Sequence, residues 1–233
     1  LAECNKTSLK DFKVAMWSND ELAPVSKEIA QRCEEVGNKL NSVGTTVSFA
    51  AKPEHDFKKA EINYQLLLQS VMQSGLPEDE YQKIEELASS LDKNDLSVEA
   101  ILAKGTVLSH RNWLRQNYAR EQIKISWSKF FEEWDVLICP QLATTAIKHD
   151  HKKISERTVM VDNQEQRYFQ QIFWPGLAVN AHLPSTVFPT GLSSDGMPIG
   201  LQVIGGAYED KTTIKFAELY EEEFKTFVVP NLD

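Results

Sequence analysis

The chain has 233 residues, of which 42% are hydrophobic and 9% aromatic, and its 34 acidic residues outnumber its 25 basic ones. These proportions are typical of a globular protein, so they exclude wholesale disorder, a collagen-like repeat and a small disulfide-rich scaffold. The formal net charge of −9 disfavours nucleic-acid binding, and we expect no nucleic-acid partner. No linker rich in Gly, Ser or Pro divides the chain, and we interpret residues 1–233 as a single α/β unit.

Cysteine usage and the length of the apolar runs indicate the compartment. Cys4, Cys33 and Cys139 are an odd number of cysteines without a CxxC pair. This pattern favours free thiols in a reducing compartment, and we expect a cytoplasmic location. The longest apolar runs, such as residues 136–139, are far shorter than the about 20 residues of a membrane-spanning helix, so we expect no membrane partner. Because the first residue is Leu1 rather than Met, we expect a processed chain or a piece of a longer protein.

The beginning of the chain has the pattern of a strand, a helix and a second strand. Residues 12–17 form an apolar run between polar residues, which is typical of a strand. Apolar residues then recur at steps of four and three over residues 25–40, which predicts an amphipathic helix that ends near Gly44. Residues 45–50 alternate and are β-branched, which predicts another strand. This order is that of a βαβ unit, in which the neighbouring strands are parallel.

The middle of the chain has mainly helical patterns, interrupted by Gly, Pro and Asp residues. In chain order we expect helices in several pieces over residues 55–104, broken near 75–77 and 92–95, a long helix over 108–134, a short buried strand over 135–140, a loop over 141–162, and a helix over 163–181 that is bent or interrupted at Pro175-Gly176. The buried strand ends at its proline because proline cannot donate a hydrogen bond to a neighbouring strand.

The end of the chain predicts a hairpin followed by a helix. Residues 185–188 and 198–205 have strand patterns, and the polar residues between them include Asp195 and Gly196, which suit a tight turn. A helix with one apolar face follows Asp210. Antiparallel strands here and parallel strands at the beginning of the chain together predict an α/β fold with a mixed sheet.

No complete catalytic motif occurs in the sequence, since a P-loop, GxGxxG, GxSxG and HExxH are all absent. The adjacent serines at residues 89–90 and 193–194 have no neighbouring base, and we interpret them as helix-end and turn residues. The segment HDH at residues 149–151 resembles part of a zinc site, but it lacks further ligands and is flanked by lysines. We interpret this segment as a solvated loop or the edge of a pocket, and we expect no metal.

Two neighbouring stretches near the end of the chain carry a family resemblance. Residues 183–192 read LPSTVFPTGL, and residues 195–205 read DGMPIGLQVIG. Their combination of Leu-Pro, Pro-x-Gly, Gly-x-Pro-x-Gly-x-Gln and a final Gly resembles the carboxy-terminal half of amidase signature family enzymes. Further agreement occurs at residues 12–17, 23–25, 137–140, 149–151 and 212–219, and it is weakest over residues 55–108.

The resemblance implies both a fold and a chemistry. The implied fold is an α/β/α sandwich with a mixed β-sheet. The implied reaction is the hydrolysis of carboxylic amides through a Ser-cis-Ser-Lys triad and a serine acyl-enzyme, without metal or cofactor. In the family, the lysine and the Gly/Ser-rich loop of the triad precede the strand that begins here at Phe12, and nothing in this sequence matches them. No residue of this chain is therefore assigned a catalytic role.

We accordingly expect the carboxy-terminal part of an amidase, with the catalytic residues upstream, so that this chain alone is inactive. The expected partners are a small-molecule amide and either the missing amino-terminal catalytic half or a second copy of the chain, since half a sandwich exposes sheet edges and apolar faces. The alternative from another class is a non-catalytic binding or assembly domain on the amidase fold. Primary aliphatic, aryl, peptide C-terminal and indoleacetamide-type amides all remain open as substrates.

Five residues are candidates for substrate binding, by analogy with positions in the family's fold. Thr144 belongs to the loop after the buried strand, Tyr168 and Trp174 belong to the following helix, and Asn180 and His182 belong to the turn before the next strand. Tyr168 and Trp174 fit a place in the core equally well, and His182 also fits the cap at the carboxyl end of a helix.

Overall fold

The computed structural model describes residues 1–152 and 156–230. The chain divides into two compact units. Leu1–Glu54 and Trp127–Asp233 form the first, which we call the sheet unit, and His55–Ser126 form the second, which we call the helical unit. The predicted single α/β unit over residues 1–233 stays a prediction, because the compactness of two parts does not decide whether each folds alone.

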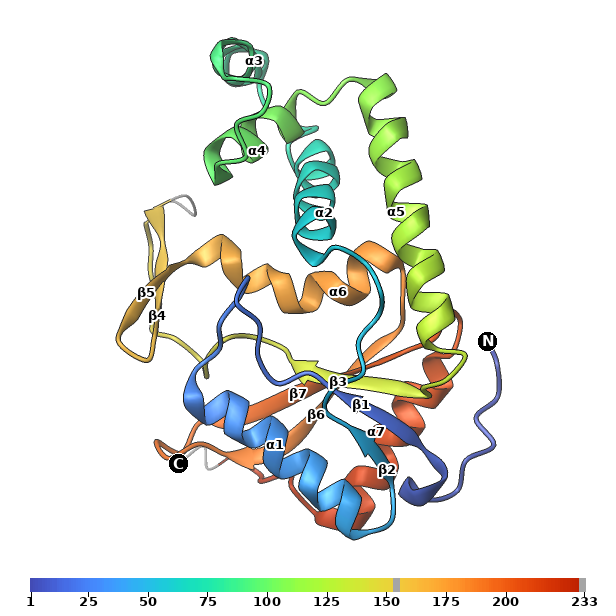
Figure 1. The fold of residues 1–233 in the computed structure, drawn as a ribbon. Coiled ribbons are helices and arrows are strands. Elements are labelled where there is room, and N and C mark those ends of the chain that lie inside the picture. Colours follow the sequence, from blue (N-terminus) through green and yellow to red (C-terminus); the bar gives the residue numbers. More distant parts are fainter. Residues whose placement is uncertain (153–155, 231–233) are drawn as a thin grey trace. The chain divides into compact units, whose positions relative to one another are not determined.

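A five-stranded mixed sheet lies at the centre of the sheet unit as far as the structure describes it (Figure 1). Its strands are β1 (Lys13–Met16), β2 (Thr46–Ser48), β3 (Val136–Pro140), β6 (Ser185–Leu192) and β7 (Pro198–Gly205). They lie in the order β2-β1-β3-β7-β6. β1 pairs in parallel with β2 and β3, whereas β7 is antiparallel to both β3 and β6. The predicted mixed sheet is thus confirmed.

The helix α1 (Lys27–Ser42) connects β1 to β2 and completes the predicted βαβ unit. It begins where the Ser26 hydroxyl accepts a hydrogen bond from the Ile29 N–H at 3.3 Å. Its buried residues recur at steps of three and four, which places one apolar stripe against the sheet. Gly44 follows the helix with a φ of +89°, a conformation that glycine adopts without the strain a side chain would add.

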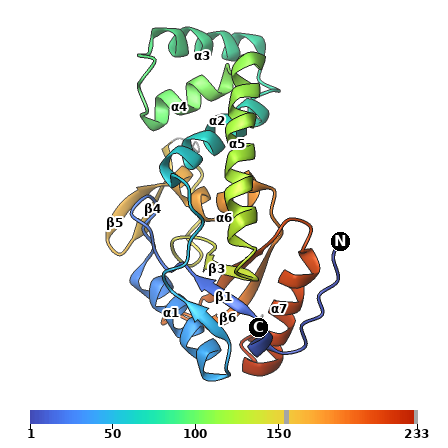
Figure 2. The ribbon, with the colours of Figure 1, turned by 45° about the vertical axis from the view of Figure 1, so that its right-hand side comes forward.

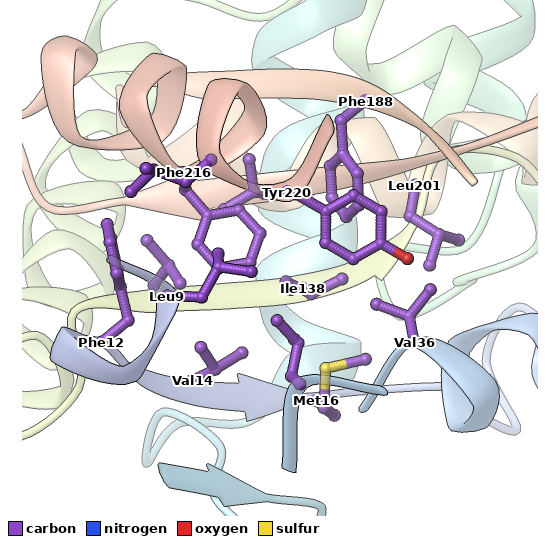
Figure 3. Packing of buried hydrophobic residues seen from close by; sticks show 14 of the residues in the cluster. Leu9, Phe12, Val14, Met16, Val36, Ile138, Phe188, Leu201, Phe216 and Tyr220 are labelled. Atoms are coloured by element: carbon purple, nitrogen blue, oxygen red, sulfur yellow. The ribbon is translucent and has the colours of Figure 1, made fainter. Parts of the chain in front are cut away.

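The main apolar cluster lies on the face of the sheet that α1 and α7 (Asp210–Phe224) cover (Figure 3). Met16 and Ile138 point toward this face because successive side chains of a strand point to opposite sides. The ring of Tyr220 on α7 packs edge-to-face against Phe188, with the ring centroids 4.7 Å apart. Each large side chain that is fully buried in this way contributes about 1.5–3 kcal/mol to folding.

The opposite face of the sheet is covered by α6 (Phe173–Ala181), so that the sheet lies between two helical layers (Figure 1). The indole of Trp174 on α6 packs edge-to-face against Trp17, which directly follows β1, with ring centroids 5.4 Å apart. The Gln202 side chain on β7 points to this face and donates to the backbone oxygen of Trp174 at 2.8 Å. The predicted α/β fold class is confirmed.

A second hairpin stands where the sequence predicted a loop and a helix. β4 (Thr158–Val161) and β5 (Gln164–Arg167) pair antiparallel, so the loop over residues 141–162 and the helix over 163–181 were wrong for these residues. The turn consists of Asp162 and Asn163 with φ of 47° and 65°, the left-handed values that two-residue hairpin turns require. The helical prediction failed because the polar residues of β5 lack a strand's alternation of apolar and polar side chains.

The rest of the predicted helix over residues 163–181 consists of two segments. The short 3-10 helix η3 (Tyr168–Ile172) leads directly into α6. The expected interruption at Pro175-Gly176 was wrong, because α6 continues through both residues. Pro175 lies in the first turn of α6, where a missing N–H removes no hydrogen bond within the helix.

The helical unit contains α2 (Phe57–Met72), α3 (Glu78–Ser90), α4 (Val98–Thr106) and most of α5 (His110–Phe130) (Figure 2). The predicted breaks near residues 75–77 and 92–95 are confirmed. α2 and α4 approach each other closely, since a Cβ on Gly105 would lie only 2.8 Å from the Cβ of Gln69. The two ends of the unit meet where His55 Nδ1 and Ser126 Oγ lie 3.1 Å apart. No helix among the described residues is long and apolar enough to span a membrane.

Candidate functional site

The carboxyl ends of β1, β2 and β3 lie at one edge of the sheet, because these three strands are parallel. Ligands of open α/β sheets bind outside this edge, where the loops that follow the strands come together. We call this edge, with residues 17–26 after β1 and the β3 loop at residues 141–147, the carboxyl edge. It is the candidate functional site of the sheet unit.

Hydrogen bonds hold the β3 loop in place between two other segments. The Ala143 N–H donates to Gln171 Oε1 in η3 at 3.2 Å, and the Ala143 carbonyl accepts from the Ser26 N–H at 2.8 Å. Gln171 in turn donates through Nε2 to Gln166 Oε1 in β5 at 3.1 Å, and Gln166 Nε2 donates to the Pro24 carbonyl at 2.8 Å. Because these bonds join both loops of the carboxyl edge to β5 and η3, the edge has a defined shape.

Gln202 is the most buried polar residue at the carboxyl edge, with 1% of its surface exposed. Its Nε2 donates to the Pro140 carbonyl at 3.1 Å and to the Trp174 carbonyl at 2.8 Å, and it lies 3.2 Å from the Cys139 sulfur. Its Oε1 accepts from the Ser185 hydroxyl at 3.0 Å. One side chain thereby links the end of β3, the start of α6 and the start of β6.

The sequence analysis did not single out Gln202 as a site residue, although it belongs to the Gly-x-Pro-x-Gly-x-Gln pattern. The available signal was one amide side chain within the otherwise apolar run from Ile199 to Ile204. A buried amide in such a strand needs hydrogen-bond partners, and these come from other elements.

The structure brings two of the predicted substrate-binding residues to the same part of the carboxyl edge. Thr144 is half-buried and follows Ala143 in the β3 loop, while Tyr168 is half-buried at the start of η3. The hydrogen bond from Ala143 to Gln171 joins the two segments. The Arg157 guanidinium lies 5.7 Å from the centre of the Tyr168 ring.

Trp174 lies in the interior, with none of its surface exposed. Its indole Nε1 donates to the Ala23 carbonyl at 3.1 Å, so its polar atom is used by the protein itself. The indole therefore secures residues 17–26 against α6. Whether substrate binding also depends on it stays a prediction.

Asn180 and His182 lie toward the other end of α6. Asn180 is buried and follows Trp174 by six residues, which is about 9 Å along the helix and a different face. His182 is exposed and ends α6 in the left-handed conformation, with φ 54° and ψ 44°. The helix-cap interpretation of His182 is thus confirmed, while binding roles for both residues stay predictions.

Comparison with known proteins decides the family. Residues 1–214 match the family model described as amidase. The chain belongs to the amidase family. The resemblance to the amidase signature family is thereby confirmed.

Curated relatives of this amidase-family chain include two bacterial proteins, each named as the same component of glutamyl-tRNA(Gln) amidotransferase. The protein from Oceanobacillus iheyensis is 26% identical over 94% of the chain and 46% of its own length. The protein from Thermosynechococcus vestitus is 34% identical over 47% of the chain and 21% of its own length. The chain thus spans at most about half the length of these relatives.

Solved structures show the same fold. A bacterial aryl acylamidase of the amidase signature enzymes family superposes with a TM-score of 0.64 at 17% identity, over 91% of this chain and 43% of that one. A 6-aminohexanoate cyclic dimer hydrolase gives a TM-score of 0.62 at 18% identity, over 94% of this chain and 46% of that one. The α/β architecture of the sheet unit is therefore the one that these enzymes have.

The thiols and serines of the amidase-family chain have structural surroundings. Burial raises the pKa of the Cys33 thiol to about 12 and that of Cys139 well above its usual range, so both are protonated and weak nucleophiles at neutral pH. Ser193 Oγ accepts from the Met197 N–H at 3.0 Å in the turn of the β6–β7 hairpin, and Ser90 Oγ donates to the Leu87 carbonyl at 2.7 Å at the end of α3. The turn and helix-end interpretations of these serines are confirmed.

The segment at residues 149–151 has its two imidazole rings stacked with centroids 6.3 Å apart. Within residues 1–152 and 156–230, no three His, Cys, Asp or Glu side chains are grouped so that they could hold a metal ion.

Proposed function

We propose that this chain is the carboxy-terminal part of an amidase that hydrolyses carboxylic amides to an acid and ammonia or an amine. The chemistry passes through a serine acyl-enzyme whose catalytic residues lie upstream of Leu1. The observation that carries this proposal is the match of residues 1–214 to the amidase family. The coverage of 46% of a full-length relative supports the placement of the triad on the missing part.

The role of this chain in that reaction is to shape and hold the amide pocket. The β3 loop and η3 lie together at the carboxyl edge, and Ala143, Gln171 and Gln202 hold them in place. A small-molecule amide would contact Thr144 and Tyr168 there. The missing amino-terminal half is the expected partner, and the three free cysteines support a cytoplasmic location.

The class of amide is left at carboxylic amides in general. The relatives are named for a component of an amidotransferase, and the structural neighbours are named for an aryl acylamidase and a cyclic dimer hydrolase. Their names cover different acyl and amine groups, so no narrower substrate class is proposed.

Amide hydrolysis tests the proposal directly. The purified chain and the product of the full natural reading frame are assayed on a small aliphatic amide and an aryl amide. Activity in the longer protein alone is the expected result. Activity in the short chain would place a catalytic group among its own residues and overturn the proposed division. If both proteins are inert, the non-catalytic binding or assembly domain becomes the better interpretation.

The pocket residues are tested in the active longer protein. Thr144→Val and Tyr168→Phe are expected to raise KM for one amide more than for another, because they change groups at the carboxyl edge. Trp174→Ala is the comparison variant, since its indole is buried. A loss of stability in Trp174→Ala with unaltered substrate preference would remove Trp174 from the pocket.

A further inference from the structure

One face of α5 is exposed and mixes basic with apolar side chains. Within the helical unit the exposed residues recur at steps of four and three, which places them on one side of the helix. Leu114 is 50% exposed, Tyr118 68% and Ile125 49%, which is unusually high for side chains of this size. We call this surface the basic face; its residues are Arg111, Leu114, Arg115, Tyr118, Gln122 and Ile125.

The charge of the basic face is not balanced within its own helix. Between His110 and Ser126, α5 carries four basic residues and one acidic residue. That acidic residue, Glu121, pairs with Lys124 at 3.0 Å. Arg111 and Arg115 take part in no ion pair with any residue that the structure describes. The basic face therefore stands out in a chain whose formal net charge is −9.

The helix α3 has the complementary composition. It carries five acidic residues and one basic residue, and none of its thirteen residues is buried. Lys83 pairs with Asp79 on the same helix at 3.5 Å, while Glu85 and Glu86 are exposed and take part in no ion pair in the described part of the chain. Leu87 beside them is 39% exposed. We call the surface of Glu85, Glu86 and Leu87 the acidic face.

We propose that the basic face of α5 binds the acidic face of α3 in a second copy of this chain. Each copy carries both surfaces at the periphery of its helical unit, so each contact joins opposite charges (Figure 2). Contacts of α3 with α3 or of α5 with α5 would join like charges and are disfavoured. A second copy is the occupant that the chain itself supplies, with apolar side chains on both surfaces.

The two kinds of side chain have different tasks in this interface. Exposed ion pairs contribute little affinity, so Leu114, Tyr118 and Leu87 supply most of the buried apolar area. The charges select the partner helix and make association depend on salt. The interface is accordingly expected to be weak and to weaken further as the salt concentration rises.

Charge reversal tests the proposal with the full 233-residue chain. The basic-face variant is Arg111→Glu with Arg115→Glu, and the acidic-face variant is Glu85→Lys with Glu86→Lys. Sedimentation velocity up to about 100 µM at low salt measures association, and circular dichroism checks folding. The wild-type chain is expected to associate, and each variant to associate at least about tenfold more weakly.

Mixing the two variants is the decisive arm. The reversed α5 of one variant then meets the reversed α3 of the other, and the remaining pair is wild type, so association is expected to return. A chain with all four reversals is expected to associate by itself, for the same reason. A variant with Lys58→Glu and Lys93→Glu changes the net charge equally on other exposed parts of the unit and is expected to behave like the wild type.

Three results would overturn the proposal. These are a monomeric wild type at the highest concentration, association that the reversals leave unchanged, or a mixture that stays as weak as its components. A control variant as weak as the basic-face variant would assign the effect to net charge alone and would also reject the interface.

Discussion

The sheet unit and the helical unit differ in where their side chains are used. In the sheet unit, strands far apart in the chain pair with one another and bury side chains on both faces. In the helical unit, α3 has no buried residue and α5 exposes a long face. The family resemblance is correspondingly strong in stretches of the sheet unit and weakest over residues 55–108. The comparison teaches that recognisable sequence patterns occur here where many elements constrain one residue.

The largest expected difference between the units comes from a core cavity. Phe216 has none of its surface exposed and packs against Phe12 and Phe188, so Phe216→Ala should lower the free energy of unfolding by about 3–5 kcal/mol. Leu87→Ala on α3 should cost less than about 1 kcal/mol, because the side chain is already partly in water. Urea denaturation measures both variants, and equal losses would contradict the difference between the units.

The next largest effect concerns buried polar groups. Gln202→Leu removes the donor to the Pro140 and Trp174 carbonyls and leaves both oxygens buried, which should cost about 2–4 kcal/mol. The matched change in the helical unit is Gln82→Leu, whose amide donates to the exposed Glu78 at 3.0 Å, and it should cost less than about 0.5 kcal/mol. Faster hydrogen exchange in the β3 loop of Gln202→Leu would show that the amide holds this loop.

A pH effect is expected in the helical unit. Burial lowers the pKa of His55 from its usual 6.5 to about 4, so the folded state favours the neutral ring. The unfolded chain then binds more protons between these values, and the stabilisation is present above pH 6.5 and is lost as the pH falls toward 4. The ring is partly exposed, so we expect a loss of about 1–2 kcal/mol rather than the full linkage value.

The control for His55 is a variant that does not titrate in this range. His55→Asn should show a flatter dependence of unfolding free energy on pH between 6.5 and 4 than the wild type. Asp56 has a lowered pKa through hydrogen bonds from the Lys59 backbone, and its contribution is common to both proteins and cancels in the difference. Parallel curves for the two proteins would reject the assignment to His55.

The smallest effect should be equal in the two units. Ser26 caps α1 and Ser97 caps α4, and in both cases the hydroxyl accepts a backbone N–H at 3.3 Å. Either serine changed to alanine should cost about 1 kcal/mol, because capping is local and does not depend on the rest of the unit. A clearly larger cost for Ser26→Ala would show that its position next to Ala143 adds to the cap.

The sequence by itself determined the elements whose patterns repeat over neighbouring residues. The apolar stripe of α1, the glycine after it and the β6–β7 turn all follow from local periodicity and local backbone preference. The parallel pairing of β1 with β2 followed from the helix between them. The combination of short motifs near residues 183–205 was enough to indicate the family.

Only the tertiary structure decided the features that depend on distant segments. The strand β5 is polar, and it forms because β4 pairs with it and because Gln166 reaches the Pro24 carbonyl. Trp174 is buried because its indole finds the Ala23 carbonyl, and Gln202 is tolerated in an apolar strand because three elements supply its partners. A sequence pattern reports whether a residue prefers water or core, whereas hydrogen-bond partners far along the chain are set only when the segments meet.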